Sequence, residues 1–470
     1  MQFDSFLFIA FLSAVIFLYY AMPSWRLRKG VLLGASYLFY AAWSPPLVIL
    51  IWISTLTDYF IARQIFRSHQ DLYRKMLLLV SLAVNLGLLG YFKYAQFLLD
   101  SFDHMVAQIG IVYQAPDMDI ILPIGISFYT FQTISYTIDV YRRQHKPDHG
   151  LLDFSLYVTF FPQLVAGPIV RAGHFLPQCD RAPKVQIHEI AWGLTLLLFG
   201  LFAKIVLADI VMAPVADQVF YSPADARTLD AWFGMFAFSG QIFFDFSGYS
   251  LCALGIAMIL GFALPDNFRS PYAAIGFSDF WERWHISLSS WMRDYLYISM
   301  GGNRNGSAKT FRNLMFTMFL GGLWHGASWN FVIWGGLHGL YLTAEHGLIK
   351  VFGGRFTGAI YQTFVILLTF ILVTLAWIPF RAANIHDSLT LFSHLFTLLP
   401  GSEIDFNSKL LVGIVISATL GWHAYTRSKT LEERWIALPV WLRISVLMSM
   451  VLLIGICSTG DSRAFIYFQF

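Results

Sequence analysis

Long apolar runs recur along this chain from residue 5 to residue 458, separated by short charged stretches. A helix needs roughly 20 residues to cross the hydrocarbon core of a bilayer, and lipid offers no hydrogen-bond partner to an open backbone. The composition agrees, because 57% of the 470 residues are hydrophobic and only 13% are charged. We therefore expect an all-α polytopic membrane protein with about 9–11 transmembrane helices, plus re-entrant and interfacial helices. No linker divides the chain, so residues 1–470 are expected to form a single domain.

Basic residues orient the expected helices, because Lys and Arg collect in short loops on the cytoplasmic side. The loop 100–119 has four aspartates and neither Lys nor Arg, so we expect it outside, together with the N-terminus. The net charge of +3 is dispersed, and nucleic acid is not an expected partner. The clusters that mark cytoplasmic loops are Arg26, Arg28 and Lys29; Arg63, Arg67, Arg74 and Lys75; and Arg142, Arg143 and Lys146.

Two apolar segments have basic residues at both ends, so we expect each to enter the membrane and return on the same side. The first is 154–170 and the second is 313–346. At a rise of about 1.5 Å per residue, residues 313–324 extend roughly 18 Å. This length predicts that His325 lies near the middle of the bilayer, at the turn of a broken hairpin.

His325 is the strongest functional candidate, because an ionisable residue at membrane depth must face protein or a water-filled cavity. Gly321, Gly322 and Gly326 flank it and suggest a broken backbone. Two interpretations stay open from the residues alone: a structural imidazole held by backbone carbonyls, or a general base that titrates near neutral pH. A metal ligand is not favoured, because the chain has no HExxH and no comparable ligand spacing.

His285 is the second candidate. Residues 278–299 are expected to form one amphipathic helix capped by Ser278, with an apolar stripe that includes Trp281, Trp284 and Trp291. His285 falls at the edge of this stripe and could point into the protein. The alternative is an aromatic-belt helix at the membrane interface, in which His285 only hydrogen-bonds a carbonyl.

Weaker candidates could contact a substrate. A buried carboxylate such as Asp245 needs a partner, and Gln163 could line the same cavity. The chain has no GxSxG elbow, Walker loop or Rossmann glycine pattern, so we favour direct transfer between two bound substrates over a covalent enzyme intermediate. The candidate substrate-binding residues are Asp245, Gln163, Trp324, Asn330 and Arg293.

Six phrases, in this order along the chain, resemble the membrane-bound O-acyltransferase family, and within it the bacterial alginate O-acetylation branch. Together they form a motif core at about 121–346, plus the last few residues, and they are specific as a set. The phrases are PIGISFYTFQTISYTIDVYR, FFPQLVAGPIVR, FDFSGYS, FWERWHISLSSWMRDYLYISMGGNR, GGLWHGASWNFVIWGGLHG and FIYFQF.

The resemblance implies that helices around a central tunnel pass an acyl group from a cytoplasmic thioester to a hydroxyl acceptor on the opposite side. The family's catalytic histidine maps onto His325 and its second motif histidine onto His285. The implied donor is acetyl-CoA, with no permanently bound cofactor and no metal. The implied location is the cell inner membrane, so the N-terminus that the charge pattern places outside would be periplasmic. The implied partners are membrane lipid, a periplasmic SGNH esterase-like acetyltransferase and an exported polysaccharide such as alginate.

One position departs from the branch, where an acidic residue is expected directly after SGYS but Leu251 stands here. This departure leaves the identity of the acceptor open. Three other functions are also open: D-alanyl transfer from a carrier protein to teichoic acid, transport of an acyl donor without chemistry, and a structural anchor for a secretion complex.

Overall fold

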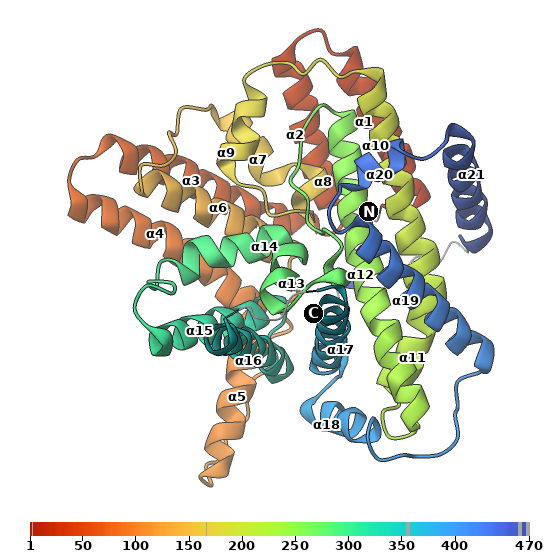
Figure 1. Ribbon diagram of the computed structural model, residues 1–470. Coiled ribbons are helices and arrows are strands. Elements are labelled where there is room, and N and C mark those ends of the chain that lie inside the picture. The colour runs from red at the N-terminus through yellow and green to blue at the C-terminus, as the bar shows by residue number, and fades with distance from the viewer. Residues whose placement is uncertain (2, 166, 354–357, 459–462, 467–470) are drawn as a thin grey trace. The chain divides into compact units, whose positions relative to one another are not determined.

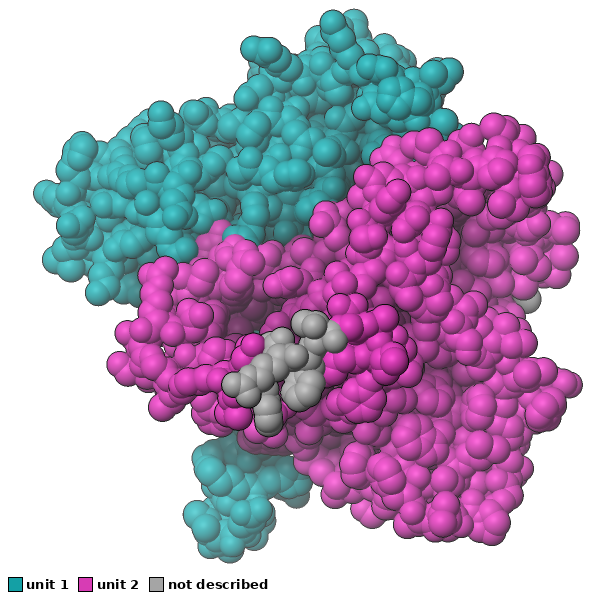
Figure 2. Space-filling view, viewed as in Figure 1, with its two compact units in different colours: residues 1–194, 253–265 teal, residues 195–252, 266–470 magenta. Residues whose placement is uncertain are grey.

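The computed structural model describes residues 1, 3–165, 167–353, 358–458 and 463–466. These residues form helices and loops and contain no strand, which confirms the expected fold class. The chain has two compact units, which we describe one at a time (Figure 2). Unit 1 is residues 1–194 with 253–265, and unit 2 is residues 195–252 with 266–470.

Unit 1 contains the helices of the N-terminal part of the chain (Figure 1). A fully buried carboxylate, Asp58 on α3, joins three of them: it accepts hydrogen bonds from Asn85 on α4 and Thr137 on α6, each at 2.7 Å. These bonds replace the water that the carboxylate loses on burial. The helices are α1 (Phe6–Ala21), α2 (Trp25–Ala41), α3 (Val48–Arg67), α4 (Asp71–Leu89), α5 (Ala95–Gln108), α6 (Ile126–Tyr141), α7 (Leu151–Thr159), α8 (Phe161–Leu164), α9 (Ala172–Phe175), the first part of α10 (Ile187–Phe202) and the last part of α12 (Thr228–Ile259).

The segment expected to be re-entrant, 154–170, is a broken helix. α7 ends at Thr159, and α8 is only four residues long. Gly125, before α6, has φ 74°, and a Cβ there would lie 2.6 Å from the Leu164 carbonyl oxygen. The backbone at Gly125 therefore touches the end of α8, a contact that requires glycine. Such irregular backbone suits a site enclosed by protein, and its depth in the membrane stays a prediction.

Unit 2 contains the hairpin of α15 (Ser307–His325) and α16 (Trp329–Phe352) (Figure 1). The helix break expected at His325 is therefore present, because α15 ends at this residue and Gly326 has extended backbone. The other helices of this unit are α11 (Ala213–Tyr221), most of α12 (Thr228–Ile259), α13 (Phe277–Arg283), α14 (Ile286–Trp291), α17 (Ala359–Arg381), α18 (Ile385–His394), α19 (Phe406–Thr426), α20 (Leu431–Ile436) and α21 (Val440–Cys457), with π-helical turns η4 (Ala203–Met212) and η6 (Met292–Tyr297).

Six helical stretches among the described residues are long and apolar enough to cross a bilayer, so the protein is a multi-pass membrane protein. The other crossings in the expected total of nine to eleven would come from shorter or more polar helices, such as α1 and α19. The loop expected at 100–119 is wrong in its first part, because apolar residues extend α5 to Gln108. The six stretches are Pro45–Arg67, Asp71–Gln108, Ile187–Tyr221, Thr228–Ile259, Ala359–Arg381 and Val440–Cys457.

Candidate active site

His325 is the last residue of α15 and is 4% exposed. Its ring is enclosed by aromatic side chains, with centroid distances of 5.0 Å to Trp324, 4.9 Å to Trp334 and 5.3 Å to Phe380. The His285 ring lies 6.4 Å away, so the structure brings together the two histidines that the sequence singled out. An apolar enclosure of this kind strengthens every electrostatic interaction inside it, because water no longer screens the charges.

His285 does not lie inside a helix, and the single helix expected over 278–299 is wrong. The chain is extended at Trp284, and His285 itself has φ 44° and ψ 53°, a left-handed conformation between α13 and α14. The break is held by the loop before α13: Ile286 N–H donates to the Asn267 carbonyl at 3.0 Å. Ser278 also does not cap the helix, because Gly276 occupies that position and Ser278 donates to Glu345 instead.

The Asn267 side chain sets the tautomer of His285. The backbone N–H of Ser287 donates to Asn267 Oδ1 at 3.3 Å, and Asn267 Nδ2 donates to Ser250 Oγ at 3.3 Å, so the amide orientation is fixed. Since the same oxygen lies 3.1 Å from His285 Nδ1, Nδ1 carries the proton and Nε2 carries the lone pair. Burial lowers the pKa of His285 to about 3, so the ring is neutral at physiological pH.

An ion-pair cluster fixes the helix that precedes His285. Arg283 Nε and Arg427 each donate to the Asp279 carboxylate at 2.7 Å, and Ile275 N–H donates to it at 2.8 Å. Burial alone would raise the pKa of Asp279, but these three donors outweigh it and hold the pKa below its usual value. α13 is therefore tied to α19 through a carboxylate that stays ionised.

His338 on α16 is a buried histidine that the sequence analysis did not single out. Its ring lies 4.8 Å from Trp334 and 5.1 Å from Trp281. Trp334 therefore separates it from His325. The sequence did contain a pattern that places His338 beside Trp334: the two positions are four residues apart and share one face of a helix.

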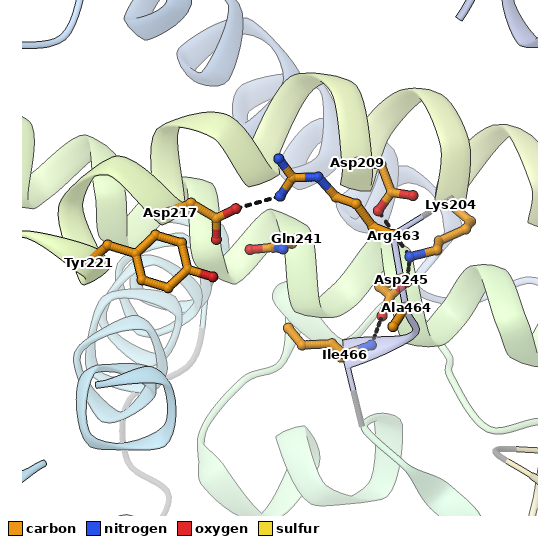
Figure 3. Close-up of a pocket in the computed structure, with 9 residues that line it drawn as sticks. All are labelled: Lys204, Asp209, Asp217, Tyr221, Gln241, Asp245, Arg463, Ala464 and Ile466. Carbon is orange, nitrogen blue, oxygen red and sulfur yellow. Dashed lines mark hydrogen bonds and ion pairs between the residues drawn. The ribbon is translucent and has the colours of Figure 1, made fainter. Parts of the chain in front are cut away.

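Asp245 on α12 lies at a cavity of about 320 Å³ (Figure 3). Its Oδ1 pairs with Lys204 at 2.7 Å, and its Oδ2 accepts the Ile466 N–H at 2.7 Å. The next residue, Phe246, packs its ring 4.7 Å from His285. His325 and His285 line neither this cavity nor a second one of about 410 Å³ beside Asp230 and Glu403.

The remaining candidates have different surroundings. Trp324 contacts both site histidines, with its ring 5.8 Å from His285. Asn330 donates to the Ala382 carbonyl at 2.8 Å and so anchors α16 to the end of α17.

Arg293 is 62% exposed and pairs with the adjacent Asp294, so it lies outside the buried cluster. Gln163 belongs to unit 1, where it donates to the Tyr157 carbonyl at 2.7 Å. No three metal-binding side chains gather within the part of the chain that the structure describes.

Comparisons with known proteins agree on one family. The family model "MBOAT, membrane-bound O-acyltransferase family" matches residues 140–385, a range that contains both site histidines. The chain is 40% identical over 416 residues to the probable alginate O-acetylase AlgI of Azotobacter vinelandii, covering 88% of this chain and 81% of that protein. It is 36% identical to the peptidoglycan O-acetyltransferase of Helicobacter pylori, covering 82% and 76%. It is 30% identical to the teichoic acid D-alanyltransferase of Bacillus subtilis, covering 48% and 60%.

Proposed function

The chain belongs to the membrane-bound O-acyltransferase family and is a membrane O-acyltransferase, and from this premise we propose that it transfers acetyl from cytoplasmic acetyl-CoA toward an exported polysaccharide. The observation that carries the proposal is the pair of histidines enclosed by aromatic rings, with His325 at a helix break and His285 6.4 Å away. The similarity to proteins named O-acetyltransferases supports acetyl as the group transferred.

The proposed step uses His325 as a general base. Its imidazole removes the proton from the acceptor hydroxyl while the hydroxyl oxygen attacks the thioester carbonyl carbon. The carbon–sulfur bond then breaks, and the leaving thiolate takes the proton back from the imidazolium. The products are an O-acetyl ester and free CoA. General-base assistance of this kind is worth about 10²–10⁴-fold in rate.

We assign His285 a role in orienting the acceptor rather than in stabilising negative charge. A neutral imidazole with its Nδ1 proton committed to Asn267 presents only a lone pair at Nε2. A lone pair can accept a hydrogen bond from a hydroxyl, but it cannot donate one to an oxyanion. His285 is therefore suited to hold a hydroxyl of the acceptor group.

Replacing His325 tests the chemistry. In vesicles with radiolabelled acetyl-CoA on the cytoplasmic face and a hydroxyl acceptor on the opposite face, His325→Ala should lower CoA release by at least about 100-fold. The matched control is His423→Ala, which also removes a buried imidazole from unit 2, but one that accepts a hydrogen bond from Tyr272 N–H at 3.2 Å. Undiminished acetyl transfer by folded His325→Ala would remove this residue from the mechanism.

The same vesicles separate the alternatives. A transporter without chemistry would move intact acetyl-CoA across the membrane and release no CoA. A D-alanyltransferase, the function named for the Bacillus subtilis relative, would accept D-alanyl carrier protein in place of acetyl-CoA. A structural anchor would tolerate His325→Ala without any loss of polysaccharide acetylation.

A periplasmic partner with an SGNH esterase-like fold completes the proposal. It would receive the acetyl group and deliver it to the polymer, with this chain in the cell inner membrane. The division of labour is supported if polymer acetylation stops when such a partner is deleted, while the purified chain still releases CoA when it is given a hydroxyl acceptor. Full polymer acetylation without the partner would contradict it.

A further inference from the structure

The C-terminal residues 463–466 form one wall of the cavity at Asp245 (Figure 3). Arg463, Ala464 and Ile466 line the cavity, whereas Phe465 between them is not part of the lining. Phe465 and Ile466 are 3% and 2% exposed, so these two residues are inserted into unit 2, whereas Arg463 is 44% exposed.

Two carboxylates hold this segment. Asp245 accepts the Ile466 N–H at 2.7 Å and pairs with Lys204, which also pairs with Asp209 at 2.9 Å. Asp217 pairs with Arg463 and, at 3.0 Å, with Arg381 at the end of α17. A hydrogen bond to an ionised group is about twice as strong as one between neutral groups, so these contacts fix the segment in both position and direction.

The held segment contacts the active site through two aromatic rings. The Phe465 ring lies 5.9 Å from Phe246, and the Phe246 ring lies 4.7 Å from His285 in an edge-on arrangement. Phe465 also packs 5.0 Å from Tyr249, one turn further along α12. Since close-packed interiors transmit displacements, moving the segment would shift Phe246 and, with it, the His285 imidazole.

We propose that Asp245 is a positioning residue: with Lys204 it anchors residues 463–466, so that Phe465 and Phe246 hold His285 in place for the acceptor. This inference rests on the proposed function of His285. It assigns Asp245 an indirect role, because its carboxylate is already occupied by Lys204 and the Ile466 N–H.

The first measurement reports on the segment without relying on activity. In a Cys457→Ser background, the engineered thiol of Ile466→Cys should be alkylated slowly in the intact protein, because position 466 is buried. Adding Asp245→Asn should speed alkylation about tenfold or more, since one hydrogen bond to a charged group is lost. An unchanged rate would overturn the anchoring role, whether or not the protein acetylates anything.

The second measurement separates positioning from general stability. The matched control is Asp230→Asn on the same helix, which removes a buried carboxylate paired with Lys409 at 3.6 Å. Asp245→Asn should raise the KM for the hydroxyl acceptor at least several-fold and leave the KM for acetyl-CoA unchanged, whereas Asp230→Asn should change neither. Equal losses in both variants, or an altered donor KM, would overturn the proposal.

Variants of the ring contact complete the test. Phe465→Ala should raise the acceptor KM as much as Asp245→Asn does. Phe465→Tyr should keep the acceptor KM of the parent protein, because the ring remains. Normal acceptor kinetics in folded Phe465→Ala would contradict the proposed connection to His285. If the intact protein consumes no thioester, the proposed function fails, while the alkylation result still decides whether Asp245 holds the segment.

Discussion

At the scale of single residues, the proposed function depends on the protonation state of His285. The ring is neutral because burial lowers its pKa to about 3, and its tautomer follows from the Asn267 amide oxygen 3.1 Å from Nδ1. A histidine that is neutral across the physiological range cannot make acetyl transfer depend on pH near pH 6.5. The pH dependence of the intact protein should therefore come from other groups.

Replacing Asn267 with a carboxylate should create a pH dependence. In Asn267→Asp a negative charge faces Nδ1–H, favours the imidazolium and raises the pKa of His285 above about 3. As the pH falls through this raised pKa, Nε2 gains a proton and can no longer accept a hydrogen bond from the acceptor. The pH profile of CoA release should thus gain a second acidic limb, in addition to the one expected from protonation of the general base His325. Asn267→Asp with an unchanged profile would contradict the assigned role of Nε2.

At the scale of elements, close backbone contact joins α15 and α16. A Cβ on Gly322 would lie 2.1 Å from the Phe331 carbonyl oxygen, and one on Gly335 would lie 2.2 Å from the Met318 carbonyl oxygen. Small residues let membrane helices approach this closely. The contact fixes the hairpin whose turn presents His325.

Alanine at one of two neighbouring glycines should show this contact. Gly322→Ala forces the helices apart and should cost about 1–3 kcal/mol of stability, which lowers the temperature at which the detergent-solubilised protein unfolds. Gly321→Ala is the control, because a Cβ there meets nothing within 4 Å. It should be neutral or slightly stabilising, since alanine favours helix over glycine. Equal melting temperatures for the two variants would contradict the backbone contact.

Elements fixed by local pattern could be predicted from sequence, and elements fixed by distant partners could not. The break at His325 follows from its flanking glycines and from the apolar runs on either side. The break at His285 depends on Asn267, eighteen positions earlier, and an amphipathic pattern carries no information about that contact. The pairing of Asp245 with Lys204 and Ile466 is equally non-local.

At the scale of the whole molecule, the charge pattern makes a definite prediction about the sides of the membrane. The basic loops near Arg67 and Lys309 are expected in the cytoplasm and the loop at Asp117 outside. The helices between these loops are long enough to cross, since the stretch Asp71–Gln108 has 38 residues. Both ends of the α15–α16 hairpin should therefore lie on the cytoplasmic side, as expected for a segment that enters and returns.

Single cysteines and a membrane-impermeant maleimide can test this arrangement in intact cells, with the three native cysteines replaced. Asp117→Cys should be labelled from outside, whereas Ser68→Cys, Lys309→Cys and Lys350→Cys should react only after the cytoplasmic face is opened.

Ala327→Cys, at the turn beside His325, should react slowly from either side, because a thiol at membrane depth rarely ionises and the thiolate is the reactive form. Rapid outside labelling of Ala327→Cys would place His325 at the surface, and labelling of Lys350→Cys from outside would show that α15 and α16 do not return to one side. In either case the two substrates would have to meet at a different depth from the one proposed.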